Sequence, residues 1–336
     1  MDYSQILSQQ FNIKEEYAKN IITLLDDGNT IPFIARYRKE MHGSMDDQLI
    51  REFAEKLEYL RGLDKRRDEI RSLIDAQEKL TDEINLALDK AATLSELEDI
   101  YRPYRPKRKT RASIAKEKGL EPLANDILKQ EKGFDPSKSA VDYIDEEKGV
   151  TSVEDAIQGA MDIIAELVSD NAEIRKRIRN LTNANGVLVS VATDEEKDSV
   201  YKNYYDYKEP VKKIAGHRVL AVNRGEKEGF LKVSVETDSE KPLNSIFRAM
   251  ITDKNQLCSD IIREACTDAY QRLIYPSIER EVRNDLTDTA AENAMKVFAV
   301  NLKQLLMQPP VKGKIVLALD PGYRTGCKTA VVDSTG

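Results

Sequence analysis

Two consecutive prolines, Pro309 and Pro310, separate two parts of the chain that have different secondary-structure patterns. Proline lacks a backbone N–H and clashes with the preceding turn, so the pair must end any helix that reaches it. Before the pair, apolar residues recur mainly every three or four positions, which is typical of packed helices. After it, residues 315–319 and 329–332 form two short β-rich runs joined by a turn. The double proline is therefore the clearest domain boundary.

The composition narrows the class of protein. The chain has 336 residues, of which 40% are apolar and 33% charged, and no apolar run is long enough to cross a membrane. Three cysteines without CxxC spacing and two histidines make a zinc site improbable, so free thiols in a reducing cytoplasm are expected. The N-terminus lacks the features of a signal peptide. We expect a cytoplasmic protein with no membrane partner, no metal and no cofactor.

Helical spacing dominates the region before the double proline. Residues 45–80 predict one long helix or two collinear ones, and Pro276 is expected to separate two later helices. Residues 216–235 contain two alternating runs around a glycine-flanked polar turn, which predicts a β-hairpin. The sequence therefore predicts a mainly α, multi-helical fold with a small β-hairpin.

The densest charge cluster is at residues 102–118, which hold eight basic residues and one acidic residue, a net charge of +7. The whole chain carries −7, but screening over about 8 Å lets a local basic patch act alone. Pro103 and Pro106 forbid a regular helix, so these side chains are expected on a stiff, exposed loop. Such a loop suits phosphate recognition, with Tyr101 or Tyr104 available to stack on an unpaired base. The candidate nucleic-acid-binding residues here are Arg102, Arg105, Lys107, Arg108, Lys109 and Arg111.

The alternative for this loop is a solvated segment whose cations pair with acidic helices of the same protein, such as those carrying Glu96 and Asp99. A smaller basic group, Arg36, Arg38 and Lys39, adds further candidates. Its simpler interpretation is surface charge on a short helix with Tyr37 packed inward. Residues 175–179, with three arginines and a lysine, are expected to be a solvated helix face.

Asp320 directly follows the first β-rich run, and Asp333 follows the second. Carboxylates from several strands hold the cations in two-metal phosphoryl transfer, so Asp320 is a candidate metal ligand. One carboxylate is far from a sufficient set, and an Asp-Pro-Gly sequence is also a common turn at the exit of a strand. Asp333 is more simply a turn-former. The sequence therefore gives no catalytic residue, with Asp320 as a vestigial candidate.

Several segments together resemble the Tex family of bacterial transcription accessory proteins, relatives of a eukaryotic elongation factor. The resemblance runs in the family's order along the whole chain. The segments that carry it are residues 32–40, 97–111, 117–124, 169–175, 217–221 with 224–229, and 319–328.

The resemblance implies a helical N-terminal region with a helix-turn-helix-like part, followed by a YqgF-type, ribonuclease-H-like domain. Helix-hairpin-helix elements and an OB-fold RNA-binding domain come later in the family. The chain is therefore expected to be an N-terminal fragment with three regions: residues 1–190 (helical N-terminal region), 191–310 (central helical region with the hairpin) and 311–336 (start of a truncated YqgF-like domain).

The family is associated with RNA, single-stranded nucleic acid and transcription, and its YqgF-like domain is regarded as lacking a full catalytic set. These properties favour a non-enzymatic scaffold that binds RNA or single-stranded nucleic acid through the backbone, with the transcription machinery as a further partner. The resemblance gives Asp320 the place of the first-strand carboxylate and makes residues 102–111 a candidate backbone contact. A metal-dependent nuclease or resolvase using Asp320 and a protein-docking scaffold are the alternatives.

Overall fold

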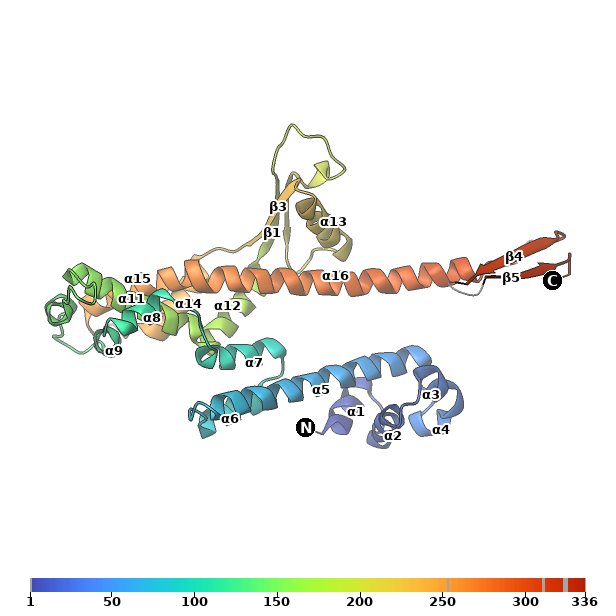
Figure 1. Cartoon of the computed structure of the whole chain (residues 1–336), viewed down its shortest axis with the longest axis horizontal. Helices are drawn as coiled ribbons and strands as arrows, with labels where there is room; N and C mark the ends of the chain where they lie inside the picture. The colour runs from blue at the N-terminus through green and yellow to red at the C-terminus, as the bar shows by residue number, and fades with distance from the viewer. Residues whose placement is uncertain (1, 253, 310–311, 323–325, 336) are drawn as a thin grey trace. The chain divides into compact units, whose positions relative to one another are not determined.

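The computed structural model describes residues 2–252, 254–309, 312–322 and 326–335, most of them in helices (Figure 1). The mainly α fold predicted from the sequence is confirmed. The chain forms two compact units: residues 1–183 with 238–279, and residues 184–237 with 280–336. The division predicted at residues 190 and 310 stays a prediction. Within the described ranges, no helix is both long and apolar enough to cross a membrane.

The first unit is helical. Its first half contains α1 (Tyr3–Phe11), α2 (Glu15–Asp26), α3 (Ile31–Tyr37), α4 (Lys39–His42), α5 (Asp47–Asp75), α6 (Asp82–Lys90) and α7 (Leu94–Tyr101). A 3₁₀ turn (Arg102–Tyr104) leads to α8 (Arg111–Glu117), α9 (Glu121–Lys129), α10 (Pro136–Ala140), a second 3₁₀ turn (Val141–Tyr143) and α11 (Val153–Asp170). The unit ends with α12 (Ala172–Asn185), which extends beyond its boundary, α14 (Glu240–Met250), α15 (Gln256–Asp268) and a π-helical segment (Ala269–Ile274).

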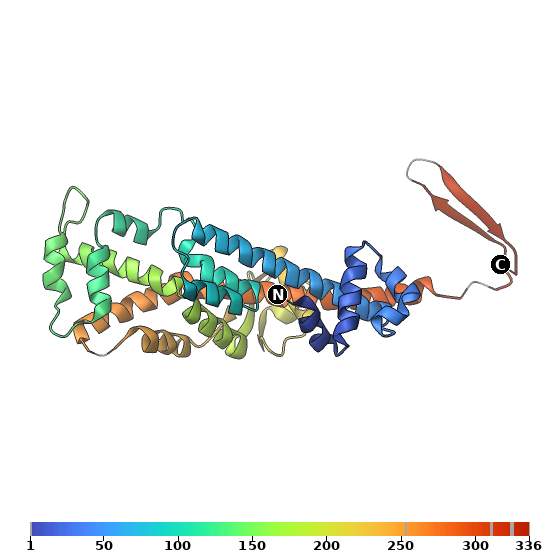
Figure 2. The ribbon, with the colours of Figure 1, turned by 90° about the horizontal axis from the view of Figure 1, so that it is seen from below.

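The long helix α5 supports the N-terminal helices. Ile50, Phe53 and Leu57 recur every three or four residues, so they line one face of α5, and all three are buried. They share a hydrophobic core with Leu7 of α1 and Ile34 of α3. In Figure 2 the blue helices α1 to α4 lie beside one end of α5. The position of α3 is therefore fixed to the first turns of α5.

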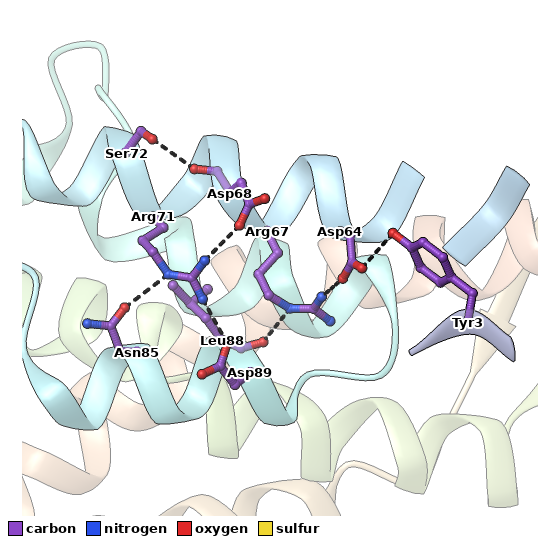
Figure 3. Close-up of polar contacts among 9 residues, drawn as sticks. All are labelled: Tyr3, Asp64, Arg67, Asp68, Arg71, Ser72, Asn85, Leu88 and Asp89. Atoms are coloured by element: carbon purple, nitrogen blue, oxygen red, sulfur yellow. Dashed lines mark hydrogen bonds and ion pairs between the residues drawn. The ribbon is translucent and has the colours of Figure 1, made fainter. Parts of the chain in front are cut away.

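Two arginines attach α6 to the other half of α5 (Figure 3). The buried Arg67 donates from Nε to the Leu88 carbonyl at 2.9 Å and from Nη2 to the Ala91 carbonyl at 2.9 Å. Carbonyls at the C-terminal end of a helix lack partners in their own helix, so Arg67 satisfies them. One turn later, Arg71 donates to Asp89 at 2.7 Å. A cation thus serves as the C-terminal cap of α6.

The helical run does not break at Pro276. The π-helical segment Ala269–Ile274 joins α15 directly to α16 (Tyr275–Leu306), so the predicted separation at this proline is wrong. A proline in a helix leaves one carbonyl without its usual donor, and a local π turn is a common way to accommodate the defect. Helix α16 ends three residues before Pro309, whereas Pro310 lies outside the described residues.

The second unit contains a three-stranded antiparallel sheet with the order β2-β1-β3, formed by β1 (Val187–Ala192), β2 (Asp206–Pro210) and β3 (Leu231–Glu236). A 3₁₀ turn (Lys202–Tyr204) precedes β2, and α13 (Gly216–Lys227) precedes β3. The register places Leu188 opposite Glu209 on one side and Val235 on the other. Leu188 and Val233 belong to the core cluster of this unit.

The β-hairpin predicted for residues 216–235 is wrong in its first half, which forms the helix α13 and not a strand. Its second half forms the strand β3, as predicted. The apolar run at residues 219–222 is too short for its periodicity to separate the two structures. Val219 and Val222 lie three residues apart, and both are buried on one face of α13. Gly225 allows this helix to approach β3, since a Cβ there would lie 2.6 Å from Cδ1 of Leu231.

The two strands predicted at the C-terminal end are confirmed. β4 (Val316–Pro321) and β5 (Cys327–Val332) pair antiparallel, and Asp320 lies opposite Lys328. The Asp333 carboxylate accepts hydrogen bonds from the backbone N–H and the hydroxyl of Thr335, at 2.8 and 2.6 Å, as expected of a turn-former.

A pair of glycine substitutions tests the packing of α11. A Cβ at Gly159 would lie 2.3 Å from Cδ1 of the buried Leu120 and 3.4 Å from Cβ of Ala115, so Gly159→Ala overpacks this interface. We expect it to lower the free energy of unfolding by about 1–3 kcal/mol. Gly62→Ala, in α5, where a Cβ would meet no atom within 4 Å beyond the neighbouring backbone of its own helix, should raise it by about 0.5–1 kcal/mol. Urea unfolding followed by circular dichroism measures both, and equal effects would contradict the packing.

Candidate nucleic-acid interface

The basic loop, residues 102–111, connects α7 to α8. Pro103 lies in the 3₁₀ turn, and no α-helix crosses Pro106. Thr110 then starts α8 with a capping box, in which its side chain and that of Ser113 each accept from the other's backbone N–H. The loop is thus irregular between two fixed helix ends, as the prolines predict.

The start of the loop is attached to the end of α5. Nε2 of Gln77 donates to the Tyr104 carbonyl at 2.9 Å, and the N–H of Arg105 donates to the Tyr101 carbonyl at 3.1 Å. Tyr101 is 6% exposed, with the guanidinium of Arg66 5.7 Å from its ring centroid. Its predicted availability for stacking is therefore wrong, because the ring packs in the helical core. Tyr104 is partly buried.

An acidic stripe on α11 pairs with two cations of this loop. Asp162, Glu166 and Asp170 lie four residues apart, so they form a stripe along one face of the helix. Asp170 pairs with Nε of Arg102 at 3.4 Å. Lys107 pairs with both Asp170 and Glu166, at 3.5 Å from the latter.

Asp162, at the other end of this acidic stripe, is partly buried. Burial raises the pKa of its carboxyl, while the nearby charges of Arg272 and Arg111 oppose that shift. Arg111 is thus the third loop cation near the stripe. The expectation that loop cations pair with acids of the same protein is confirmed for Arg102 and Lys107, with α11 rather than Glu96 or Asp99 as the partner.

Three other loop cations, Arg105, Arg108 and Lys109, form no ion pair with α11, so they remain available to other anions. All three residues are exposed. Arg105 and Arg108 form no ion pair with the rest of the described chain. Lys109 lies 3.9 Å from Glu117, but both side chains are more than 60% exposed, so the pair contributes little.

The second basic group is at residues 36–39. Arg36 and Lys39 are exposed, and neither forms an ion pair within the described ranges. Tyr37 is 64% exposed, so the expectation that it packs inward is wrong. The residue of α3 that packs inward is Ile34, three positions earlier and 0% exposed.

The arginines of α12 form a buried network that the sequence did not indicate. Arg175 donates from Nε to Asp99 at 2.6 Å and Arg179 donates from Nη2 to the same carboxylate at 2.5 Å. The side chains of Arg175 and Asp99 are 3% and 7% exposed. The predicted solvated face at residues 175–179 is therefore wrong for these two arginines. Burial, followed by the charge of Arg175, lowers the pKa of Arg102 at the start of the basic loop.

Models of known protein families match most of the chain. The Tex-like protein N-terminal domain matches residues 1–75, the Tex central region-like family matches residues 131–298, and the Tex protein YqgF-like domain matches residues 314–336. The chain belongs to the Tex family.

Relatives of this Tex chain match it from end to end. YdcI of Bacillus subtilis is 45% identical over 343 residues, which cover 100% of the chain and 48% of YdcI. The transcriptional accessory protein Tex of Neisseria gonorrhoeae is 38% identical over 347 residues, covering 100% of the chain and 45% of that protein. The human S1 RNA-binding domain-containing protein 1 is 32% identical over 352 residues, covering 99% and 35%. The chain thus spans less than half the length of these relatives.

Asp320 lies in the part that matches the YqgF-like domain of the Tex family. It is exposed on β4, and Lys328 is its partner across the strand pair. In the part of the chain that the structure describes, no three His, Cys, Asp or Glu residues are grouped to hold a metal ion.

The Asp99 network yields a stability prediction with a matched control on the same helix. Asp99→Asn removes the charge that compensates two buried guanidinium groups, so we expect the free energy of unfolding to fall by about 3 kcal/mol or more. Glu96→Gln breaks the more exposed pair with Lys176, 2.8 Å long, and should cost at most about 1 kcal/mol. Urea unfolding at neutral pH compares them. A similar small loss in both variants would contradict a structural role for Asp99.

Proposed function

We propose that this Tex-family chain is a non-catalytic scaffold that binds RNA or single-stranded nucleic acid through the phosphate backbone in a transcription-related role. The observation that carries the proposal is the set of three exposed cations, Arg105, Arg108 and Lys109, on a loop whose Arg102 and Lys107 are tied to α11. We also propose the cytoplasm as the location and the transcription machinery as a further partner.

The chemistry of the loop supports phosphate binding. An arginine fork contacts phosphate oxygens in two places, and binding releases the counterions that surround a nucleic acid. The stiffness supplied by Pro103 and Pro106 reduces the ordering cost on binding. The names of two relatives, a transcriptional accessory protein and an S1 RNA-binding domain-containing protein, support the same function.

Binding without catalysis is the better-supported form of the proposal. The name of the Neisseria gonorrhoeae relative, transcriptional accessory protein, is not that of an enzyme. A nuclease that uses Asp320 is the weaker alternative. It requires that an intact homologue cleave nucleic acid with Mg²⁺ or Mn²⁺ and that Asp320→Asn abolish the cleavage.

A cleft gives specific support to the second candidate function, protein docking. It has a volume of about 470 Å³ and lies between α6, α7 and α12, with Leu86, Ala87 and Ile100 among its apolar lining residues. Leu86 is 54% exposed. Association with transcription proteins that survives nuclease treatment and is lost in Leu86→Glu would favour docking over binding through nucleic acid.

The salt dependence of RNA binding tests the proposed role of the loop. If Arg105, Arg108, Lys109 and the exposed Arg111 neutralise about four phosphates of a single strand, log K should fall with log salt with a slope of about −3. Replacing Arg105, Arg108 and Lys109 with Ala should reduce that slope to about −1 and weaken binding at low salt. Fluorescence polarisation with labelled single-stranded RNA, in a salt series, measures the slope.

The control for this experiment removes the same charge elsewhere in the first unit. Lys129, Lys132 and Lys138 are exposed and lie outside the loop. Their replacement by Ala should leave the slope nearly unchanged. Equal slopes for the loop variant and the original chain would overturn the proposed role of the loop.

A further prediction tests whether the acidic stripe of α11 competes with RNA for the loop cations. Glu166→Gln combined with Asp170→Asn releases Lys107 and Arg102 from their ion pairs. We expect tighter RNA binding and a slope steeper by about 0.7 for each cation that becomes available. Glu146→Gln with Glu147→Gln, two exposed carboxylates in another loop, removes the same charge and controls for the change in net charge. No difference between the two double variants would show that the stripe does not compete with RNA.

A further inference from the structure

The exposed ring of Tyr37 needs an explanation that the helical core does not give. With 64% of the residue exposed, Tyr37 stands at the C-terminal end of α3. Its hydroxyl donates to no acceptor within the described ranges. An aromatic ring costs free energy when it is left in water, so a ring exposed to this extent is available to a ligand.

The residues around Tyr37 form an aromatic–cation platform, consisting of Phe33, Arg36, Tyr37, Arg38 and Lys39. Phe33, Arg36 and Tyr37 occupy positions i, i+3 and i+4, so they share one face of α3. The ring centroids of Phe33 and Tyr37 are 5.4 Å apart, and the guanidinium of Arg38 lies 5.3 Å from the Phe33 centroid. The platform therefore combines an open ring with three positive charges.

We propose that this platform is a second nucleic-acid site, in which an unpaired base stacks on Tyr37 and flanking phosphates contact Arg36 and Lys39. The inference deepens the function proposed above and rests on it. A base shows its flat face only when it is unpaired, so the ligand class is a single strand. An apolar protein partner fits less well, because docking it here would remove three charged groups from water.

Helix α5 sets the distance between the platform and the basic loop. Ile34 of α3 packs with Ile50 near the start of α5, whereas Gln77, just beyond its end, donates to Tyr104 in the loop. A rise of 1.5 Å per residue places these two attachment points about 40 Å apart. A stacked strand rises about 3.4 Å per nucleotide, so about 12 nucleotides connect the two sites.

The sequence offers a direct test because it contains no tryptophan. Tyr37→Trp introduces a sole indole on the platform, and its fluorescence should be quenched when single-stranded oligoadenylate RNA stacks on it. Tyr59→Trp is the matched control. Tyr59 is 44% exposed and has the Lys56 ammonium 4.7 Å from its ring, but Glu55 and Glu58 flank it. Equal quenching of both reporters would overturn the platform.

Measured affinities for RNA test the platform separately from the loop. Tyr37→Ala should raise the Kd for oligoadenylate at least about fivefold, whereas Tyr37→Phe keeps the ring and should bind like the original chain. An RNA of about 24 nucleotides should bind more tightly than one of about 6 nucleotides, and Tyr37→Ala should remove that advantage.

The two possible failures give different results. If the loop variant weakens binding and Tyr37→Ala does not, the platform is wrong and the loop stands. If Tyr37→Ala weakens binding and the loop variant does not, the proposed role of the loop is wrong and the platform stands. Because Tyr37 is mostly exposed, its variants should retain the far-ultraviolet circular dichroism of the original chain.

Discussion

The carboxylate of Asp99 lies between two guanidinium groups, and the position of the basic loop depends on this contact. Asp99 is two residues from the end of α7, where the loop begins, and Arg175 and Arg179 attach that end to α12. Arg175 also donates to the Ser277 hydroxyl at 3.0 Å, which includes the start of α16 in the network. A buried ion pair tolerates little displacement, because a charge separated from its partner has no water to solvate it. The loop therefore starts from a fixed point.

The acidic stripe of α11 divides the loop cations into two groups. Arg102, Lys107 and Arg111 lie near carboxylates of the same protein, whereas Arg105, Arg108 and Lys109 face solvent. Total charge alone would overstate the strength of the loop as an anion site. A phosphate competes with Glu166 and Asp170 for Arg102 and Lys107. In the second group it meets only the weak, exposed pair of Lys109 with Glu117 within the described residues. Local pairing, rather than the net charge of −7, decides which residues are available.

The sequence was sufficient to predict features that depend only on residues close together in the chain. Pro103 and Pro106 excluded a helix from the loop, and helical spacing identified α5. The errors have a different physical origin. The burial of Arg175 depends on a carboxylate 76 residues away, and the exposure of Tyr37 depends on Ile34 filling the core in its place. The spacing of residue types along the sequence shows neither the carboxylate partner of Arg175 nor the packing of Ile34 in the core. At residues 219–222, a short apolar run fitted a strand and a helix equally well.

The first unit is discontinuous, which has a consequence for folding during synthesis. Residues 238–279 complete a unit that begins at residue 1, and the 54 residues from 184 to 237 belong to the other unit. On a ribosome, α7 emerges with Asp99 long before its arginine partners, and α15 follows much later. Domains generally fold as units once their chain is complete. Until residue 268 has emerged, α11 lacks the complete α15 as a packing partner, so chaperones have their greatest opportunity to bind during this interval.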